Sequence, residues 1–585
     1  MARVTGQQDC AAIVKPTTDP KFGDYQANGV MGLAKRLKAN PRKLAESVVE
    51  QLDLADICEP PEVAGPGFIN LRLKAEYITG ELLRIAGDPN RLGIEQTAEP
   101  KTTVVDFSSP NVAKQMHVGH LRSTILGDAI CRLLEFLGHT VIRQNHIGDW
   151  GTQFGMLMAL LDEKSSQAEE HTGAALDPEL WLPLGVFEDF YRQAKQRYDS
   201  DTEFAKESRR AVALLHAGDP KYTKLWITIV QESMKHFADL YSLLGVTLTN
   251  EHTRGESKYN DMLPAVVGEL QKQGLAVVSE GAVCVFPPGF KTKEGEPLPF
   301  IIQKSDGAFL YATTDLAALY YRVFDKDMRA DRIVYVTDAR QAQHFQMLFT
   351  VADMAGWDRR DGEHVELVHV TFGSVLGEDG KPLKTRAGEN VKLRDLLDEA
   401  VERAKAVVEA KNPELSGEEK GRIAEAVGIG AVKYADYSNN RTSDYVFSFD
   451  RMLAMDGNTA PYMQYAYARI KSIERKAESK GVTIEEELKG IASLNLTEPS
   501  EFDLAKHLVR YAEAIEAAVG DYRPNHLTAY LYELAQKFSV FYTNCPVLDA
   551  PPEKRPTRLL LCDVTANTIR HGLTELLGIA VVEQM

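Results

Sequence analysis

The 585-residue sequence has few cysteines and no long apolar run. Its six cysteines include no CxxC pair, so the sequence predicts neither a zinc site nor a disulfide framework. Scattered cysteines of this kind are typical of reduced thiols in the cytosol. No apolar stretch approaches the roughly 18 residues that a membrane-spanning helix needs, and the N-terminal segment MARVTGQQDC lacks the apolar core of a signal peptide. We therefore expect a cytoplasmic protein without a membrane partner.

Two widespread phosphate-binding motifs are also missing. The chain contains neither GxxxxGKS nor GxxxxGKT, and no complete GxGxxG follows a predicted strand. A nucleotide that binds to this protein would therefore be held by groups other than a P-loop or a dinucleotide-binding loop.

The chain is acidic and long. Its 84 acidic and 67 basic residues give a formal net charge of −17, which argues against non-specific binding to nucleic acid, including DNA. A specific RNA partner stays possible, because an acidic protein can still present a local basic groove. The length exceeds what one hydrophobic core supports, so we expect three or four domains.

The sequence pattern changes twice along the chain. Residues 1–100 combine helical sequence (VMGLAKRLKANPRKLAESVVEQL), a Pro/Gly turn and the strand FINLRL. Residues 101–410 alternate strands and helices, beginning with TTVVDF, a helix and TVIRQNHI, which predicts a parallel sheet. A charged helical insertion covers about 155–255. Residues 411–585 are nearly all helical, and one expected helix is EFDLAKHLVRYAEAIEAAV with Ser500 as its cap. The fold class is therefore α/β followed by an all-α helical bundle.

The segment SSPNVAKQMHVGHLRST joins the first strand of this sheet to its helix. His117 and His120 are three residues apart and project to the same side of the helix. Gly119 has no side chain, so a phosphate or a nucleobase could approach the backbone closely. The N-terminus of such a helix offers free N–H groups to an anion. We predict a phosphate site in which each imidazole donates a hydrogen bond, with a metal-ligand pair or a plain surface cap as alternatives.

A second candidate element is the basic segment GEDGKPLKTRAGEN, residues 377–390, which follows the strand HVELVHVTF. Lys381, Lys384 and Arg386 lie close together between flanking glycines that permit movement. Mobile cations of this kind can close on a polyphosphate in its transition state. A solvated hairpin turn is the alternative interpretation.

Together the two elements resemble the class I aminoacyl-tRNA synthetases, since HVGH is similar to the HIGH motif and KPLKT to the KMSKS loop. FSSPNVAKQMHVGHLRSTILGD, NHIGDWGTQFG, KPLKTRAG and MQYAYARIKSI narrow the resemblance to the arginyl-tRNA synthetases, over essentially the whole chain. The resemblance implies an N-terminal α/β domain at 1–100 that contacts the tRNA elbow. It further implies a Rossmann-like parallel-sheet catalytic domain at 101–410 and a C-terminal helical anticodon-binding domain at 411–585.

The activity implied by the resemblance is that of an arginine–tRNA ligase. L-arginine would react with ATP to give arginyl-adenylate and pyrophosphate, and the arginyl group would then pass to the terminal adenosine of tRNA(Arg). Activation is expected to need the tRNA. Mg²⁺ would accompany ATP as a substrate, no zinc is expected, and the chain is expected to work as a monomer.

The resemblance also assigns roles to individual residues. The implied catalytic groups are His117, His120, Lys381 and Lys384; the ATP site would add Pro110, Lys114 and Gly119; and the arginine site would use Asp106, Ser108, Asn111, Tyr311, Asp315 and Gln341. Asp315 could instead cap the helix LAALYYRVF, and Tyr311 could be ordinary core. Asp149 and Trp150 in GDWG have no expected role beyond the pocket wall.

Three other functions compete with this interpretation. A small-molecule adenylyltransferase would not need the long helical tail. A non-catalytic synthetase-like tRNA-binding protein would not need the two histidines and two lysines. A synthetase for another amino acid would want different side chains at the substrate, such as a zinc site or cationic groups. Amino-acid-dependent pyrophosphate exchange separates these alternatives.

Overall fold

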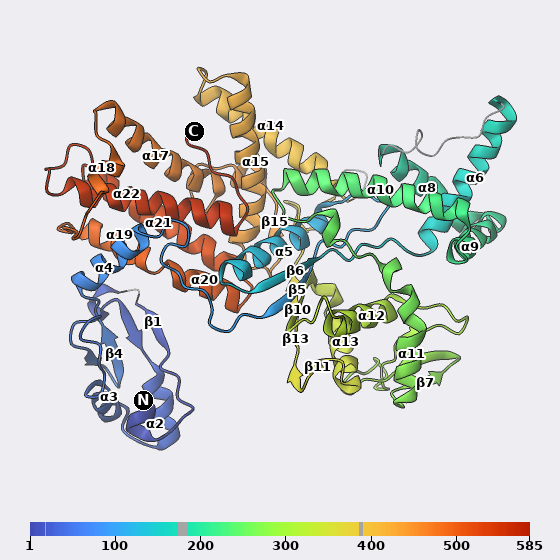
Figure 1. Ribbon diagram of the computed structural model, residues 1–585, viewed down its shortest axis with the longest axis horizontal. Coiled ribbons are helices and arrows are strands. Elements are labelled where there is room, and N and C mark those ends of the chain that lie inside the picture. Colours follow the sequence, from blue (N-terminus) through green and yellow to red (C-terminus); the bar gives the residue numbers. More distant parts are fainter. Residues whose placement is uncertain (18, 173–183, 385–389) are drawn as a thin grey trace. The chain divides into compact units, whose positions relative to one another are not determined.

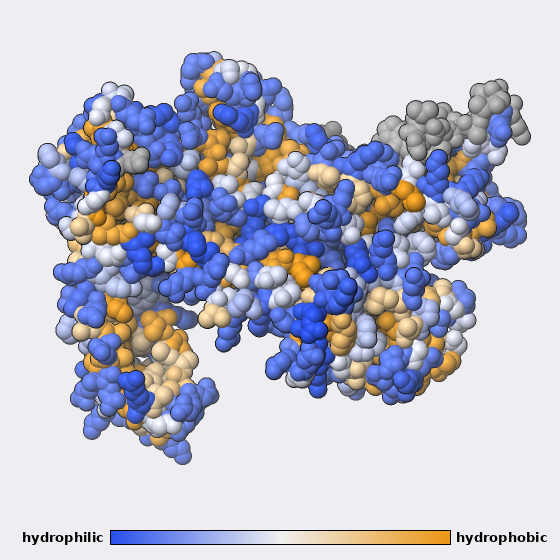
Figure 2. Space-filling model, in the orientation of Figure 1, coloured by the Kyte–Doolittle hydropathy of each residue, from blue (hydrophilic) through white to orange (hydrophobic). Residues whose placement is uncertain are grey.

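The structure is a computed structural model that describes residues 1–17, 19–172, 184–384 and 390–585. It contains two compact units. The first unit comprises Met1–Ile94, Ser472–Ala512 and Leu534–Thr568, and the second comprises Glu95–Lys471, Glu513–Glu533 and Ile569–Met585. In the part of the chain that the structure describes, no helix is long and apolar enough to cross a membrane. Figure 2 shows hydrophilic residues over most of the visible face and hydrophobic residues in separate, smaller patches.

The N-terminal part of the first unit is a four-stranded antiparallel sheet covered by short helices. The strands β1 (Val14–Pro16), β2 (Tyr25–Ala27), β3 (Glu62–Ala64) and β4 (Phe68–Leu71) lie in the order β1-β2-β4-β3. The helices are α1 (Ala2–Thr5), α2 (Gly29–Leu37), α3 (Pro41–Val49) and α4 (Ala75–Ala86). Asn40 caps α3 and Pro41 occupies its first position, which suits the fixed φ of proline. This arrangement agrees with the predicted N-terminal α/β domain.

The helix predicted from residue 501 differs from the expectation in two ways. It begins at Pro499 with Glu498 as its N-cap, so Ser500 is not the cap that the sequence predicted. Proline at the first helical position is favoured because its missing N–H has no partner there in any case. The side chain of Ser500 instead lies within the helix, 3.3 Å from the sulfur of Cys545. The helix also ends early, as α19 (Pro499–Val509), and α20 (Tyr511–Gly520) follows it.

The second unit contains the predicted parallel sheet. The strands β5 (Thr102–Asp106), β6 (Thr140–Gln144), β10 (Arg332–Asp338) and β13 (Glu366–Phe372) lie in the order β13-β10-β5-β6, all parallel. Figure 1 shows them side by side with α5 (Val118–Phe136), α12 (Tyr311–Phe324) and α13 (Ala342–Ala355) around them. In open parallel sheets, ligands bind at the carboxyl ends of the strands. Asp106 and Asp338 end two neighbouring strands, which places the loops that follow them at that edge.

Two insertions lie between β6 and β10 in the chain. The first contains α6 (Thr152–Thr172), α8 (Leu184–Ser200), α9 (Thr202–His216) and α10 (Pro220–Leu243), and its apolar side chains form one cluster with Val112, Ala113 and Ile147. The second contains η3 (Glu256–Met262), α11 (Leu263–Lys272) and the antiparallel strands β7 (Ala276–Ser279), β8 (Ala282–Val285) and β9 (Phe300–Gln303). The short η2 (Asn250–His252) lies between them.

Beyond β13 the chain is mostly helical. The helices are α14 (Leu393–Lys411), α15 (Gly417–Ser438), α16 (Phe449–Met452), α17 (Ala460–Ser479), α18 (Ile484–Leu488), α21 (Asn525–Asn544) and α22 (Arg555–Arg570), and a short π-helical turn covers His571–Leu576. One pair of two-residue parallel strands, β14 (Val375–Leu376) and β15 (Tyr445–Val446), joins the region near the sheet to this helical part. The C-terminal bundle therefore agrees with the prediction.

Candidate active site

The loop after β5 has a strained backbone. Ser108, Ser109 and Ala113 have φ values of 71°, 46° and 64°, although none of them is glycine. Left-handed non-glycine residues cost free energy and cluster at ligand sites. The hydroxyl of Ser108 is buried and lies 2.9 Å from that of Thr124 and 2.8 Å from that of Tyr241. The sequence predicts Ser108 as an arginine ligand. In the structure its buried hydroxyl stabilises the conformation of the loop.

The two predicted catalytic histidines cap the helix from which they project. The imidazole Nδ1 of His117 accepts the N–H of Gly119 at 3.0 Å, and Nδ1 of His120 accepts the N–H of His117 at 3.1 Å. A ring nitrogen that accepts carries no proton, so each neutral ring carries its proton on Nε2. The ring centroids are 4.1 Å apart. Burial, together with the neighbouring charge of His117, lowers the pKa of His120 to about 3, so the His120 ring is neutral at pH 7.

These contacts correct one expectation about the helix N-terminus. The amides of Gly119 and His120 are bonded to His117, and that of Val118 donates to the carbonyl of Val391 at 2.9 Å. The first N–H groups of α5 are therefore not free for a phosphate. Gly119 is needed for a different reason than expected, because a Cβ there would lie 2.8 Å from the His117 ring. The donors that remain for a phosphate are the Nε2–H groups of the two imidazoles.

The predicted basic loop begins as a tight hairpin. Lys381 and Lys384 are exposed, and the carbonyl of Lys381 accepts the N–H of Gly377 at 2.7 Å. The amide of Leu383 donates to Val375 at 3.1 Å, which closes the turn against β14. Residues 385–389, including Arg386, lie outside the described residues.

The far end of this loop is joined to the histidine motif. Lys392 forms an antiparallel bridge with His117. The amide of Leu393 donates to the carbonyl of Met116 at 2.9 Å, next to the bond between Val118 and Val391. The structure thus brings the far end of the KPLKT loop, at residues 391–393, to the start of the HVGH helix.

A second cluster of predicted residues surrounds Asp315. This carboxylate lies 2.6 Å from Nε2 of His344 and 3.9 Å from Nε2 of His146. It sits in the second turn of α12, whose N-cap is Leu310, so the helix-cap alternative for Asp315 is wrong. Tyr311 is 64% exposed and its ring centroid lies 4.9 Å from that of His344, so it is not core. Together these residues offer one carboxylate and one open aromatic face.

The sequence analysis did not single out Glu256, which belongs to the same cluster. Burial and the negative charges of Asp315 and Asp149 raise the pKa of Glu256 to about 7. A carboxyl held among other carboxylates in this way gains most from a bound cation. Glu256 starts η3 directly after the helical insertion, and only its position in the fold reveals it.

Asp149 and Trp150 of the GDWG segment have structural roles that explain how Glu256 is placed. The carboxylate of Asp149 accepts the N–H and the hydroxyl of Ser257, at 2.8 and 2.7 Å. Gly255 permits this approach, because a Cβ there would lie 2.2 Å from Asp149. Trp150 stacks on His216 with centroids 4.6 Å apart. Asp149 therefore fixes the segment that carries Glu256, and Trp150 packs against the helical insertion.

Asp106 is held by a buried arginine. Its carboxylate lies 2.7 Å from Nη2 of Arg322, which is fully buried, and its other oxygen accepts the hydroxyl of Ser109 at 3.1 Å. The Nε of Arg322 also donates to the side chain of Gln144. Both oxygens of Asp106 thus have protein partners, which suits a supporting role beneath the ligand site.

The other predicted residues lie on the loops around these clusters. Asn111 is exposed and forms a parallel bridge with Gly148, where a Cβ would lie 2.3 Å from the Asn111 side chain. The carbonyl of Pro110 accepts the N–H of Gly148 at 3.1 Å. The ammonium of Lys114 lies 4.7 Å from the ring centroid of Tyr191 in α8. Gln341 is exposed at the N-cap of α13.

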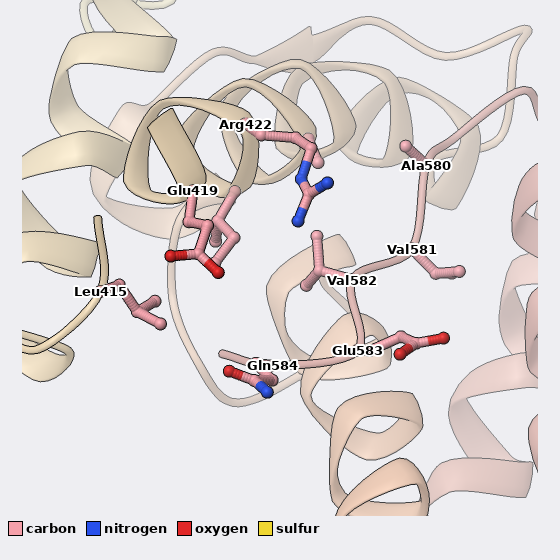
Figure 3. Close-up of a pocket in the computed structure, with 10 residues that line it drawn as sticks. Leu415, Glu419, Arg422, Ala580, Val581, Val582, Glu583 and Gln584 are labelled. Carbon is pink, nitrogen blue, oxygen red and sulfur yellow. The ribbon is translucent and has the colours of Figure 1, made fainter. Parts of the chain in front are cut away.

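A pocket of about 460 Å³ lies away from these residues. It is formed by α15, the residue Leu415 and the C-terminal segment 580–584, and Figure 3 shows Arg422 and Glu419 at its wall. None of the predicted site residues lines it. The candidate active site is therefore defined by the side-chain clusters at the carboxyl ends of the parallel strands.

Comparisons with known proteins cover the whole chain. Residues 85–449 match the family of class I tRNA synthetases (R), catalytic domain; residues 463–585 match the DALR anticodon binding domain; and residues 2–73 match the arginyl tRNA synthetase N-terminal domain. The chain is 52% identical to the arginine–tRNA ligase of a Nostoc species over 98% of its length and 95% of the relative. It is 50% identical to that of Chromobacterium violaceum over 99% and 97%. The crystal structure of arginyl-tRNA synthetase from Plasmodium falciparum is 31% identical, with a TM-score of 0.82 over 100% of this chain and 97% of that one.

Proposed function

The chain belongs to the arginine–tRNA ligases of the class I aminoacyl-tRNA synthetases, and from this premise we propose how its site performs the reaction. The enzyme activates L-arginine with ATP and transfers the arginyl group to tRNA(Arg). The observation that carries this assignment is the presence of an acidic cluster, suited to a guanidinium, together with two imidazole donors at the start of α5. Mg²⁺ enters with ATP as part of the substrate.

The guanidinium of arginine binds between Asp315 and Glu256, with the ring of Tyr311 against its face. A guanidinium is planar, always charged and stacks on aromatic rings, so two carboxylates and an open ring match it. The raised pKa of Glu256 supports this placement, because burial and two neighbouring carboxylates disfavour its charged form and a bound guanidinium would favour it. Asn111 and Gln341 hydrogen-bond the rest of the amino acid, while Asp106 and Ser108 fix the loop beneath it.

The phosphates of ATP bind against Nε2 of His117 and His120, with Pro110, Lys114 and Gly119 shaping the loop around them. The carboxylate oxygen of arginine attacks the α-phosphorus, and the bond from that phosphorus to the bridging oxygen breaks, so pyrophosphate leaves. The imidazoles donate hydrogen bonds as negative charge builds on the phosphate oxygens. Lys381 and Lys384 neutralise the leaving pyrophosphate when their loop closes.

In the second step a hydroxyl of the terminal adenosine attacks the carbonyl carbon of the adenylate. The bond from that carbon to the phosphate oxygen breaks, AMP leaves with the electron pair, and the proton of the hydroxyl passes to the departing phosphate or to water. Because both steps transfer groups between bound substrates, positioning and charge stabilisation supply the rate enhancement. Activation depends on the tRNA, whose binding completes the site.

Three domains divide this work. Residues 1–100 contact the tRNA elbow, 101–410 carry the chemistry, and 411–585 read the anticodon. The family matches at 2–73, 85–449 and 463–585 support this order. The enzyme acts in the cytoplasm as a monomer.

ATP–pyrophosphate exchange with each of the twenty amino acids, with and without tRNA, tests this function. Exchange with arginine alone, and only after tRNA is added, is the expected result. Exchange without tRNA would remove the coupling of activation to tRNA. No exchange with any amino acid would favour the non-catalytic tRNA-binding alternative.

A further inference from the structure

The first strand of the KPLKT loop is bonded to the helical part of the chain. β14 pairs with β15 in parallel register, with Val375 opposite Tyr445. The amide of Tyr445 donates to Ser374 at 3.2 Å, and the amide of Ser374 donates to the Asp444 carboxylate at 2.6 Å. The loop therefore begins on a strand held by the segment after α15, while its far end is held at the HVGH helix.

Residues 371–375, which lead into the KPLKT loop, are called the loop root. Arg441 connects this loop root to the corner between α20 and α21. Its Nε donates to the carbonyl of Tyr522 at 2.9 Å and its Nη2 to that of Asp521 at 3.1 Å. Its Nη1 donates to the carbonyl of Thr371 at 2.5 Å, at the end of β13. One planar guanidinium thus bonds three main-chain oxygens from two segments that are about 150 residues apart in sequence. Tyr522 has a φ of 52°, a left-handed conformation that the corner holds despite its cost.

Gly373, two residues beyond Thr371, is held from both sides. Its N–H donates to the carbonyl of Arg441 at 2.9 Å, and its own carbonyl accepts Nη1 of Arg122 at 2.8 Å. Arg122 is 1% exposed, lies in α5 two residues after His120, and forms an ion pair with Asp436 of α15 at 2.9 Å. A Cβ at Gly373 would come within 2.7 Å of the Ser443 backbone, so the glycine permits the close approach. The two arginines therefore join the loop root to the HVGH helix on one side and to the helical part on the other.

We propose that Arg441 is a positioning residue that couples the α20–α21 corner to the KPLKT loop, so that tRNA bound on the helical domain sets the placement of Lys381 and Lys384. The proposal rests on the proposed function. The corner lies within residues 463–585, which match an anticodon-binding domain. A shift of the Tyr522 carbonyl moves the guanidinium, and the guanidinium carries Thr371 with it. Gly377, where the loop begins, is only six residues further along the chain.

The three hydrogen bonds of Arg441 oppose separation of the corner from Thr371. Burial and the nearby charge of Arg523 lower the pKa of Arg441 to about 10, which leaves it charged at neutral pH. Arg441 is half-buried, and its bonds to Tyr522 and Thr371 are partly shielded from water, so loss of either bond would leave polar groups with fewer hydrogen bonds, at a cost in free energy. The three hydrogen bonds therefore favour joint movement of the corner and the loop root over separation.

The test compares Arg441→Lys with the matched control Arg523→Lys. Lysine keeps the positive charge but presents a point charge that cannot bond both segments in a fixed plane. Arg523 lies at the same corner, where its Nη1 is 3.6 Å from the Asp521 carboxylate. We expect R441K to lower kcat for arginylation about ten- to hundred-fold, as misplacement of catalytic groups by about 1 Å does. The KM values for arginine and tRNA should stay within about two-fold of wild type, and R523K should match wild type throughout.

Hydrogen exchange gives a second measurement that does not depend on the kinetic constants. In wild type, added tRNA should change the exchange of the amides from Gly373 to Leu383, and in R441K this change should disappear while tRNA still binds. A wild-type kcat in R441K, equal losses in R441K and R523K, or no effect of tRNA on exchange in wild type would each overturn the proposal. Failure of the wild-type enzyme to arginylate tRNA would instead refute the proposed function.

Discussion

Replacement of Glu256 by glutamine is the sharpest test of the arginine site. Burial and the charges of Asp315 and Asp149 raise the pKa of Glu256 from 4.5 to about 7 in the free protein. A raised carboxyl pKa means that the folded protein holds a proton that the unfolded chain has lost between about pH 4.5 and 7. Stability from this group is therefore fully present below about pH 4.5 and is lost as the pH rises through 7, by about 3 kcal/mol in total.

A guanidinium that binds beside Glu256 reverses this effect, because it favours the charged carboxylate. At pH 6 a group with a pKa of about 7 is roughly nine-tenths protonated, so arginine binding should release about 0.9 proton from it. At pH 8 the release from Glu256 should fall to about 0.1. The arginine affinity should consequently rise about ten-fold per pH unit up to pH 7 and then level off.

Isothermal titration of arginine in buffers of different ionisation enthalpy measures this proton release. In Glu256→Gln the release assigned to Glu256 should vanish, and the affinity at pH 8 should fall by about 2 kcal/mol, or about thirty-fold. The variant should also unfold at a higher temperature than wild type at pH 8, since one repelling charge is gone. His146 and His344 remain in both proteins, so the difference between them isolates Glu256. Glu251→Gln, at an exposed carboxylate nearby in sequence, is the control.

Two results would refute this reasoning. Equal proton release at pH 6 in wild type and Glu256→Gln would show that the carboxyl does not ionise on binding. An unchanged affinity in the variant at pH 8 would show that the guanidinium lies elsewhere, with Asp315 as its partner alone.

Other predictions concern the phosphate site and the buried framework. His120→Ala should lower the rate of pyrophosphate exchange about a hundred-fold by loss of the Nε2–H donor, whereas a wild-type rate would remove His120 from the mechanism. Because the pKa of His120 is lowered to about 3, stability from this group is present above about pH 6.5 and is lost as the pH falls towards 3, so thermal unfolding of His120→Asn should depend less on acid than that of wild type. Lys384→Gln should lower the exchange rate while leaving arginine binding by titration unchanged, and weaker arginine binding would contradict a role confined to pyrophosphate. Arg322→Leu should cost about 3–5 kcal/mol in unfolding free energy by leaving Asp106 unpaired; the double variant with Asp106→Leu should recover most of that loss, and a double variant as unstable as the single one would contradict the pairing.

Local sequence was sufficient for the parts of the site that one segment builds. The apolar run of β5, the helix stripe of α5 and the intervening HVGH predicted a strand, a helix and two imidazoles at their junction, because side-chain direction follows backbone period. The basic KPLKT segment could also be identified from the sequence, because its lysines and flanking glycines lie close together in the chain. The prediction of Ser500 as the N-cap was wrong because the helix begins at Pro499. Proline is favoured at the first helical position, which makes Glu498 the N-cap.

Only the tertiary structure decided which groups from distant segments share a charge environment. Glu256 follows a long helical insertion, and its raised pKa depends on Asp149 and Asp315, which no local pattern connects with it. The same holds for Arg441, whose partners lie about 70 and 80 residues away in opposite directions. Periodicity and turn chemistry act over a few residues and so determine elements and local motifs, whereas burial and electrostatic coupling depend on distances in space that only the packed chain sets.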